Sequence, residues 1–308
     1  MSTSRIILCP GQGAQSVGMG RAWRESSPAA AAVFAEADRI VGSRFDRPLS
    51  EVCFAGPDAV LNRTDVAQPA IYVAGVACAR ALWGDSLSKG DLAAAAGLSL
   101  GEYTALHLAG AFSFAEGLEL VLLRGRAMQE AAEAVPSGMV ALIGAEPDQA
   151  MQICEQASKG QVLVPANFNA PGQIVLSGES AACGRAIECA VSMGLRASSL
   201  AVAGAFHSPI MAPAAARLAA ALASTPVKAP VCPVLSNVTG TPHDLNPDAI
   251  RSRLVEQLTR PVSWTDCCRW LASNIQGEFH ETAPGRVLAG LMRRIDRNVK
   301  VTSHDEPG

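Results

Sequence analysis

A serine flanked by two glycines lies in the run Gly97-Leu98-Ser99-Leu100-Gly101, between a small apolar run and a helix-forming run. A Gly-x-Ser-x-Gly motif in this context places the serine on a tight strand-to-helix turn, with its Oγ projecting from the carboxyl end of the strand. The glycines lack Cβ atoms, so strand and helix can approach closely. The motif therefore predicts that Ser99 is a nucleophile; the alternative is an ordinary glycine-rich turn with a helix-capping serine.

A nucleophilic serine needs a base, and histidine is the usual one. His207 begins a predicted helix just after an irregular apolar run, a usual place for a functional group. We therefore expect His207 to be the base, while a helix-capping or buried structural histidine remains the alternative. The other histidines have less suitable positions: His107 packs behind the serine, His243 lies in a proline-rich turn, His280 in a short strand and His304 in the tail.

A second glycine-rich loop, Pro10-Gly11-Gln12-Gly13-Ala14-Gln15, follows the first apolar strand, residues 5–9. It lacks the Gly-Lys-Ser/Thr ending of a phosphate-binding loop. It is either a plain strand-to-helix connection or a loop whose N–H groups face a reacting centre.

Length and composition limit the class of protein. A chain of 308 residues suits one large domain, or a domain with an insert, and its composition, 49% hydrophobic and 5% aromatic, suits an α/β protein. Its formal net charge of −3 argues against a nucleic-acid or anionic-membrane surface. Its nine cysteines form no Cys-x-x-Cys pair, which indicates core residues in a reducing compartment. The sequence begins a strand within five residues and has no apolar run of about 18 residues, so we expect no signal peptide, no membrane segment and a cytoplasmic protein.

Hydrophobic periodicity divides the chain into two units. Residues 138–202 have the order β-α-β-β-α-β, which is typical of a ferredoxin-like unit. We expect residues 135–203 to form this insert, and residues 1–134 with 204–308 to form the α/β core. Within the core, a helix is expected to start at Gln68-Pro69-Ala70, residues 233–237 to form a short strand, and the tail after Val301 to be loose.

Seven segments in fixed order carry a resemblance to a known family: residues 10–15, 97–103, 123–129, 167–173, 205–208, 257–264 and 284–285. Because of these segments, the chain resembles the malonyl-CoA:acyl carrier protein transacylases of fatty-acid synthesis and the similar acyltransferases that load polyketide synthases. The resemblance covers residues 5 to about 295. It implies an α/β hydrolase-like core with a mainly parallel sheet, a ferredoxin-like insert, and an active site in the cleft between them.

The resemblance also implies the roles of the reacting groups. Ser99 would attack the malonyl thioester, and His207 would take its proton and later protonate the departing sulfur. A backbone carbonyl, by resemblance that of Gln257, would orient the imidazole in place of a carboxylate. The backbone N–H groups of Gln12 and Leu100 would form the oxyanion hole.

The implied substrate contacts centre on Arg124. An arginine in a helix is most often a surface ion-pair partner, but in this family the matching residue clamps the malonyl carboxylate. Phe206, by its ring, fits members that take malonate rather than its α-methyl derivative. Further binding candidates are Asn167, Gln173, Gln68 and Asn237, although Asn167 and Gln173 also suit a surface turn.

The chain departs from the family at Leu98, where the family usually has histidine. This residue lines the implied acyl pocket, so leucine makes the pocket more apolar and leaves acyl selectivity open. The resemblance predicts malonyl transfer from malonyl-CoA to the phosphopantetheine thiol of acyl carrier protein, with no permanently bound cofactor, no metal, and a monomer. The alternatives are an acyl-CoA or acyl-carrier thioesterase or serine hydrolase of altered specificity, and an inactive module that only docks the carrier protein.

Overall fold

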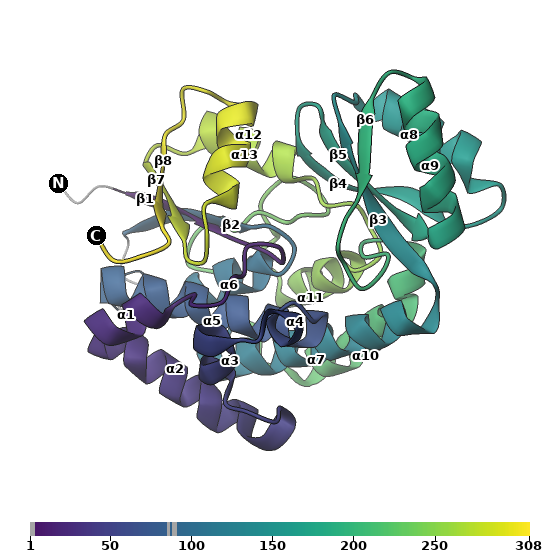
Figure 1. Ribbon diagram of the computed structural model, residues 1–308. Coiled ribbons are helices and arrows are strands. Elements are labelled where there is room, and N and C mark those ends of the chain that lie inside the picture. Colours follow the sequence, from purple (N-terminus) through teal and green to yellow (C-terminus); the bar gives the residue numbers. More distant parts are fainter. Residues whose placement is uncertain (1–3, 85–86, 88–90) are drawn as a thin grey trace.

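Two separate β-sheets organise the chain, as a computed structural model shows for residues 4–84, 87 and 91–308 (Figure 1). The elements are, in order, β1 (Arg5–Cys9), α1 (Arg21–Ser26), α2 (Pro28–Val41), η1 (Gly42–Arg44), α3 (Leu49–Ala55), α4 (Asp58–Leu61), α5 (Thr64–Trp83), β2 (Leu92–Gly97), α6 (Gly101–Leu108), α7 (Phe114–Ala134), β3 (Ser137–Ile143), α8 (Pro147–Ser158), β4 (Leu163–Ala170), β5 (Gln173–Glu179), α9 (Ser180–Ser192), β6 (Arg196–Ser199), η3 (Pro209–Met211), α10 (Ala212–Ser224), α11 (Pro247–Glu256), α12 (Trp264–Asn274), β7 (Glu278–Thr282), α13 (Val287–Ile295) and β8 (Val301–His304).

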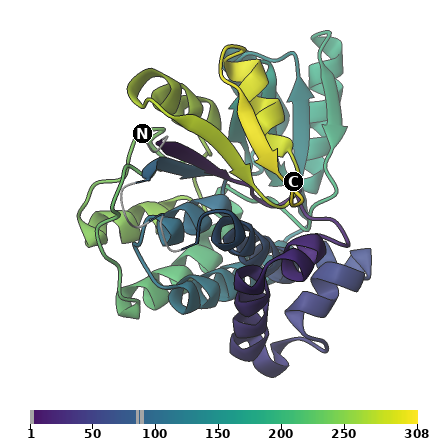
Figure 2. The same ribbon diagram turned by 90° about the vertical axis from the view of Figure 1, so that its left-hand side faces the viewer.

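The first sheet is parallel, in the strand order β2-β1-β7-β8. Successive side chains of a strand point to opposite faces. Accordingly Ile7 and Cys9 of β1 join the large core with helices α2, α5 and α7, while Ile6 and Leu8 join a second core with α12 and α13. The sheet therefore lies between two helical layers, and the view of Figure 2 shows the yellow C-terminal helix on the opposite side of the sheet from the purple and blue helices. The predicted α/β class with a mainly parallel sheet is confirmed.

The second sheet is antiparallel, in the order β4-β5-β3-β6, and packs with α8 and α9 around its own core (Figure 1). It forms from one continuous stretch of sequence between α7 and η3. Several contacts attach it to the first unit near the site, among them a β-bridge between Asn167 of β4 and Val262 and a hydrogen bond of 2.6 Å from the Ser177 hydroxyl to the Phe206 carbonyl. The division at residues 135 and 203 and the ferredoxin-like assignment stay predictions.

Helix α5 begins earlier than predicted. It starts at Thr64, and Pro69 lies inside it rather than at its first position. Proline in a helix interior removes one backbone hydrogen bond, here that to the Asp65 carbonyl, and the packing of a nearly all-buried helix outweighs this loss. The helix is also long and apolar enough to cross a membrane by length and composition, with a mean hydropathy of 1.2, but 78% of that stretch is buried in the protein. It is the central helix of the large core.

The expectation of a loose tail is wrong. Residues Val301–His304 form β8, which pairs in parallel with β7 and extends the sheet. His304 stacks on His280 with ring centroids 5.3 Å apart, and Trp83 packs edge-on against both rings. A β-branched pair, Val301 and Thr302, suits an added strand better than a free end.

Two smaller expectations also need correction. The turn after β4 is confined to Pro171 and Gly172, so Asn167 lies in a strand and is buried rather than in a surface turn. Residues 233–237 form only isolated bridges, Val234 with Ala95 and Leu235 with Pro242, because the segment turns back on itself at Thr241. The sequence patterns also missed the short helices α1, α3 and α4.

Candidate active site

The serine turn joins β2 to α6 through contacts that only glycine permits. A Cβ on Gly97 would lie 1.8 Å from the Gly101 carbonyl carbon, and one on Gly101 would lie 2.0 Å from the Cys9 carbonyl oxygen of β1. Between them Ser99 has a φ of 53°, in the left-handed region that a non-glycine residue adopts at a cost of roughly 1–3 kcal/mol. Such strain persists only where the surroundings determine the conformation, as they do here.

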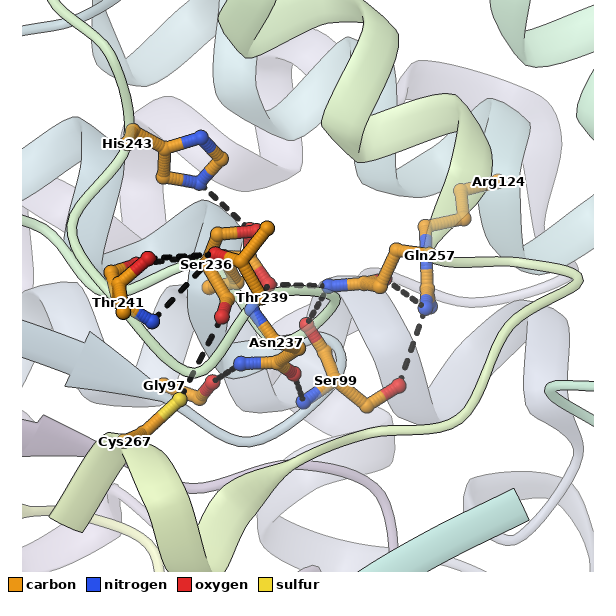
Figure 3. Close-up of polar contacts among 11 residues, drawn as sticks. Gly97, Ser99, Arg124, Ser236, Asn237, Thr239, Thr241, His243, Gln257 and Cys267 are labelled. Atoms are coloured by element: carbon orange, nitrogen blue, oxygen red, sulfur yellow. Dashed lines mark hydrogen bonds and ion pairs between the residues drawn. The ribbon is translucent and has the colours of Figure 1, made fainter. Parts of the chain in front are cut away.

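Two amide side chains hold the serine peptide on both sides (Figure 3). Asn237 accepts from the Ser99 N–H over 2.6 Å and donates to the Gly97 carbonyl over 2.7 Å. Gln257 donates from Nε2 to the Ser99 carbonyl over 3.0 Å. These bonds fix the direction in which Oγ projects.

The imidazole of His207 contacts the serine directly. Its Nε2 lies 2.8 Å from Ser99 Oγ, and its Nδ1 lies 2.7 Å from the Gln257 carbonyl oxygen. A carbonyl can only accept, so Nδ1 carries a proton and Nε2 is left free to accept one from the serine. Burial is the main cause that lowers the pKa of His207 to about 4, and the positive charge of Arg124 is the second. The hydrogen bond to Gln257 offsets this lowering only in part. The ring is therefore a neutral acceptor near pH 7.

Arg124 is a buried cation that approaches the same hydroxyl. Its Nη2 donates to Ser99 Oγ over 3.0 Å and to Gln257 Oε1 over 2.9 Å (Figure 3). Its Nη1 donates to Gln68 Oε1 over 2.5 Å. The side chain is 1% exposed and its guanidinium lies over the Tyr103 ring. Among the described residues no carboxylate lies within ion-pair distance of it, and its Nε has no hydrogen-bond partner. The hydrogen-bond acceptors of this buried guanidinium are neutral, and the charge of Glu102 acts on it only from beyond Gln257. An anion bound in the site would therefore lower the cost of burying the charge.

The backbone N–H groups of Gln12, in the loop after β1, and Leu100, which precedes α6, have no acceptor in the part of the chain that the structure describes. Gln12 lines the same cavity as Ser99, and Leu100 is the residue after it. The loop can approach the serine turn because of Gly11, where a Cβ would lie 2.2 Å from the Leu98 carbonyl oxygen. This arrangement could receive negative charge that develops on an oxygen next to Ser99.

A cavity of about 190 Å³ opens over Ser99, His207 and Arg124. Part of its wall is apolar and includes Leu98 and Phe206, and Asn167 lies in the wall from the antiparallel unit. The complete lining is Gln12, Gly13, Gln15, Asn62, Leu98, Ser99, Arg124, Met128, Met139, Asn167, Asn169, Val175, Leu200, Ala201, Val202, Phe206 and His207. This is room for a small acyl group and the end of its carrier.

Two predicted binding residues lie elsewhere. Gln173 is half-buried at the start of β5, opposite Ile143 and Ala170, and is outside the cavity lining formed by the described residues. Gln68 is buried behind the cavity, where it holds Arg124 and contacts the Met128 sulfur over 3.3 Å. Gln68 is thus placed to orient the arginine rather than to touch a ligand.

Sequence reasoning missed two polar residues beneath the serine. Glu102 and His243 are fully buried and lie 2.6 Å apart, between Glu102 Oε1 and His243 Nε2. The one signal in the sequence was a glutamate three positions after Ser99 at the start of a helix that proves to be wholly buried. Nothing in the sequence linked it to a histidine in a turn 141 positions away.

Comparison with known proteins gives a consistent result. The chain matches the family described as "Acyl transferase domain" over residues 6–301. It is 40% identical to the malonyl CoA-acyl carrier protein transacylase of Escherichia coli (strain K12) over 306 residues, which are 99% of this chain and 97% of that protein. The crystal structure of malonyl-CoA:acyl carrier protein transacylase from Xanthomonas oryzae pv. oryzae has a TM-score of 0.91 at 43% identity, and covers 100% of this chain and 96% of that one. A malonyl-transacylase solved in complex with a type II PKS acyl-carrier protein has a TM-score of 0.90 at 36% identity, and covers 99% and 97%.

Proposed function

The chain belongs to the acyl transferase family, and from this membership we propose that it transfers a malonyl group from malonyl-CoA to the phosphopantetheine thiol of acyl carrier protein. The position of Arg124 is the observation that supports malonyl as the acyl group. A buried guanidinium 3.0 Å from the nucleophile, with no salt bridge to a carboxylate of the described residues, matches a substrate that brings its own carboxylate.

The reaction proceeds in two halves through a malonyl-serine. Ser99 Oγ attacks the thioester carbonyl while its proton passes to His207 Nε2, and the tetrahedral intermediate collapses with loss of coenzyme A, whose sulfur takes that proton. In the second half the carrier thiol gives its proton to His207 and attacks the ester carbonyl. Collapse then returns the proton to Ser99 and releases malonyl carrier protein.

The site residues support each half. The free N–H groups of Gln12 and Leu100 would bind the oxyanion, at about 3–4 kcal/mol of transition-state stabilisation per donor. The Gln257 carbonyl keeps His207 in the tautomer that accepts from serine. Phe206 and Leu98 form the apolar wall beside the carboxylate clamp.

The test is incubation with labelled malonyl-CoA, with and without holo acyl carrier protein. We expect a stoichiometric malonyl adduct on Ser99 in mass spectrometry, and chase of the label onto the carrier. Label released only as free malonate would support the thioesterase alternative. Absence of any adduct would support a docking module.

The pH dependence of malonyl loading tests the base. The His207 pKa of about 4 lies below the ordinary 6.5, so the imidazole should stay neutral, and the loading rate maximal, from about pH 5 to about pH 8. Below that the rate should fall as the ring is protonated. Rapid-quench loading rates at each pH measure this, with circular dichroism to separate acid unfolding. An acid limb centred near 6.5 would contradict the lowered pKa.

Leu98→His tests the departure from the family. The added imidazole would make the pocket wall more polar beside Arg124, so we expect malonyl selectivity over acetyl to rise by about threefold to tenfold. The kcat/KM values for the two acyl-CoA substrates measure this. Unchanged selectivity would mean that leucine at this position has no influence on the choice of acyl group.

The remaining features extend the same proposal. We propose that the protein binds no permanent cofactor, because phosphopantetheine arrives on the carrier and coenzyme A with the substrate. We also propose that it acts as a cytoplasmic monomer, and that residues 135–203 form a ferredoxin-like insert in a hydrolase-like core. The β-α-β-β-α-β order and the four-stranded antiparallel sheet support the last point.

A further inference from the structure

A buried carboxylate below the serine receives three hydrogen bonds, two from the loop that carries Asn237 and His243 and one from Gln257. Glu102, in the first turn of α6, is 0% exposed. Its Oε2 accepts from the Asn237 backbone N–H over 3.0 Å and from Gln257 Nε2 over 2.7 Å. Its Oε1 lies 2.6 Å from Nε2 of His243, whose side chain is also 0% exposed.

The residues that Glu102 holds are the ones that hold Ser99. Asn237 binds the N–H side of the strained serine peptide, and Gln257 Nε2 binds its carbonyl side (Figure 3). Asn237 and Gln257 both bind the same carboxylate oxygen, so one atom of Glu102 sets the distance between the two residues that hold the Ser99 peptide.

Gln257 extends the connection to the other two reacting groups. Its backbone carbonyl accepts from His207 Nδ1 over 2.7 Å, and its side-chain Oε1 accepts from Arg124 Nη2 over 2.9 Å. The nucleophile, the base and the carboxylate clamp are therefore each one residue removed from Glu102.

We propose that Glu102, held by His243, is a positioning residue for acyl transfer: it sets the relative placement of Ser99, His207 and Arg124 through Asn237 and Gln257. It touches neither the substrate nor the reacting atoms. Small errors in such placement are costly, because a displacement of about 1 Å can lower a rate by about 10²-fold. This inference rests on the proposed function, since the effect is read as a rate of malonyl transfer.

His243 has a defined part in this arrangement. Its Nδ1 has no hydrogen-bond partner among the described residues, so a proton there would be a buried donor without an acceptor. The ring is thus best satisfied as a donor from Nε2 to Glu102. Any side chain that offers an N–H at the same place should serve, and one that cannot should not.

Glu102→Gln tests the carboxylate. Both carboxylate oxygens of Glu102 accept hydrogen bonds, so the NH2 group of a glutamine would face a donor whichever oxygen it replaced. We expect the loading kcat to fall about 100-fold, while KM for malonyl-CoA changes by less than threefold. The matched control is Glu281→Gln: Glu281 is also 0% exposed and accepts three hydrogen bonds, from the N–H groups of Leu288 and Ala289 and from the Ser303 hydroxyl, none of which bonds to Ser99, His207 or Arg124. The control should lose stability without a change in kcat.

His243→Gln and His243→Phe form the second arm, and keep the proposal testable if Glu102→Gln does not fold. Glutamine can donate to Glu102 and should keep kcat within about threefold of the parent, whereas phenylalanine should lower it about tenfold. Equal kcat values for the two variants, or an equal loss in Glu102→Gln and Glu281→Gln, would overturn the proposal. Failure of the unsubstituted protein to form the malonyl adduct would instead overturn the proposed function.

Discussion

Ser99→Ala should abolish the malonyl-enzyme and lower transfer to the carrier by about 10⁶-fold, the scale on which loss of a nucleophile acts in serine enzymes. The reason is that no other hydroxyl lies between a base and an anion clamp in the part of the chain that the structure describes: Oγ is 2.8 Å from His207 Nε2 and 3.0 Å from Arg124 Nη2. Intact-mass spectrometry after mixing with malonyl-CoA measures the adduct, and a carrier-acylation assay measures transfer.

Ser236→Ala is the matched control for that variant. Ser236 is a buried serine of the neighbouring loop whose hydroxyl has no hydrogen-bond partner among the described residues. Its loss should leave the adduct and the transfer rate unchanged within about twofold. A persistent adduct in Ser99→Ala would place the nucleophile elsewhere and contradict the proposed mechanism.

Arg124→Ala should separate malonyl from acetyl loading. Loss of a buried, hydrogen-bonded charge partner costs about 2–5 kcal/mol, so malonyl kcat/KM should fall about 10³-fold. Acetyl-CoA carries no carboxylate, so its loading should fall by less than tenfold. The measurement is kcat/KM for both substrates with the same enzyme preparation.

A neighbouring arginine on the same helix provides the control. Arg126 is exposed and pairs with Glu130 over 2.8 Å, so Arg126→Ala should leave both rates within about twofold. Equal losses for malonyl and acetyl in Arg124→Ala would show that the guanidinium supports the fold of the site rather than the substrate carboxylate. The same variant removes a charge that lowers the His207 pKa, so the acid limb of the acetyl profile should move to higher pH.

The local chemistry around Ser99 was predictable because it depends on short stretches of sequence. The two glycines, the small residues of β2 and the helix former Glu102 identify a serine turn before any fold is known, and the structure has that turn with Ser99 at positive φ. The carbonyl of Gln257 was implied only by family resemblance, because a backbone group leaves no sign in residue type.

What could not be predicted depends on distant contacts. The burial of Glu102 follows from the packing of α6 under the loop that carries Asn237 and His243, and no spacing rule connects those positions. The strand at Val301–His304 is equally non-local, since four residues become a strand only beside β7. The early start of α5 reflects burial of most of the helix, which outweighs the local preference of Pro69.

The strand order β2-β1-β7-β8 has a consequence for synthesis on the ribosome. When Arg5–Cys9 and Leu92–Gly97 leave the exit tunnel, the strand that must lie on the other side of β1 has not yet been translated. The antiparallel sheet draws its four strands from one uninterrupted stretch and can pair while the chain is still growing. The unit that brings Asn167 to the cavity can therefore mature first, and the parallel layer beneath Ser99 is completed last.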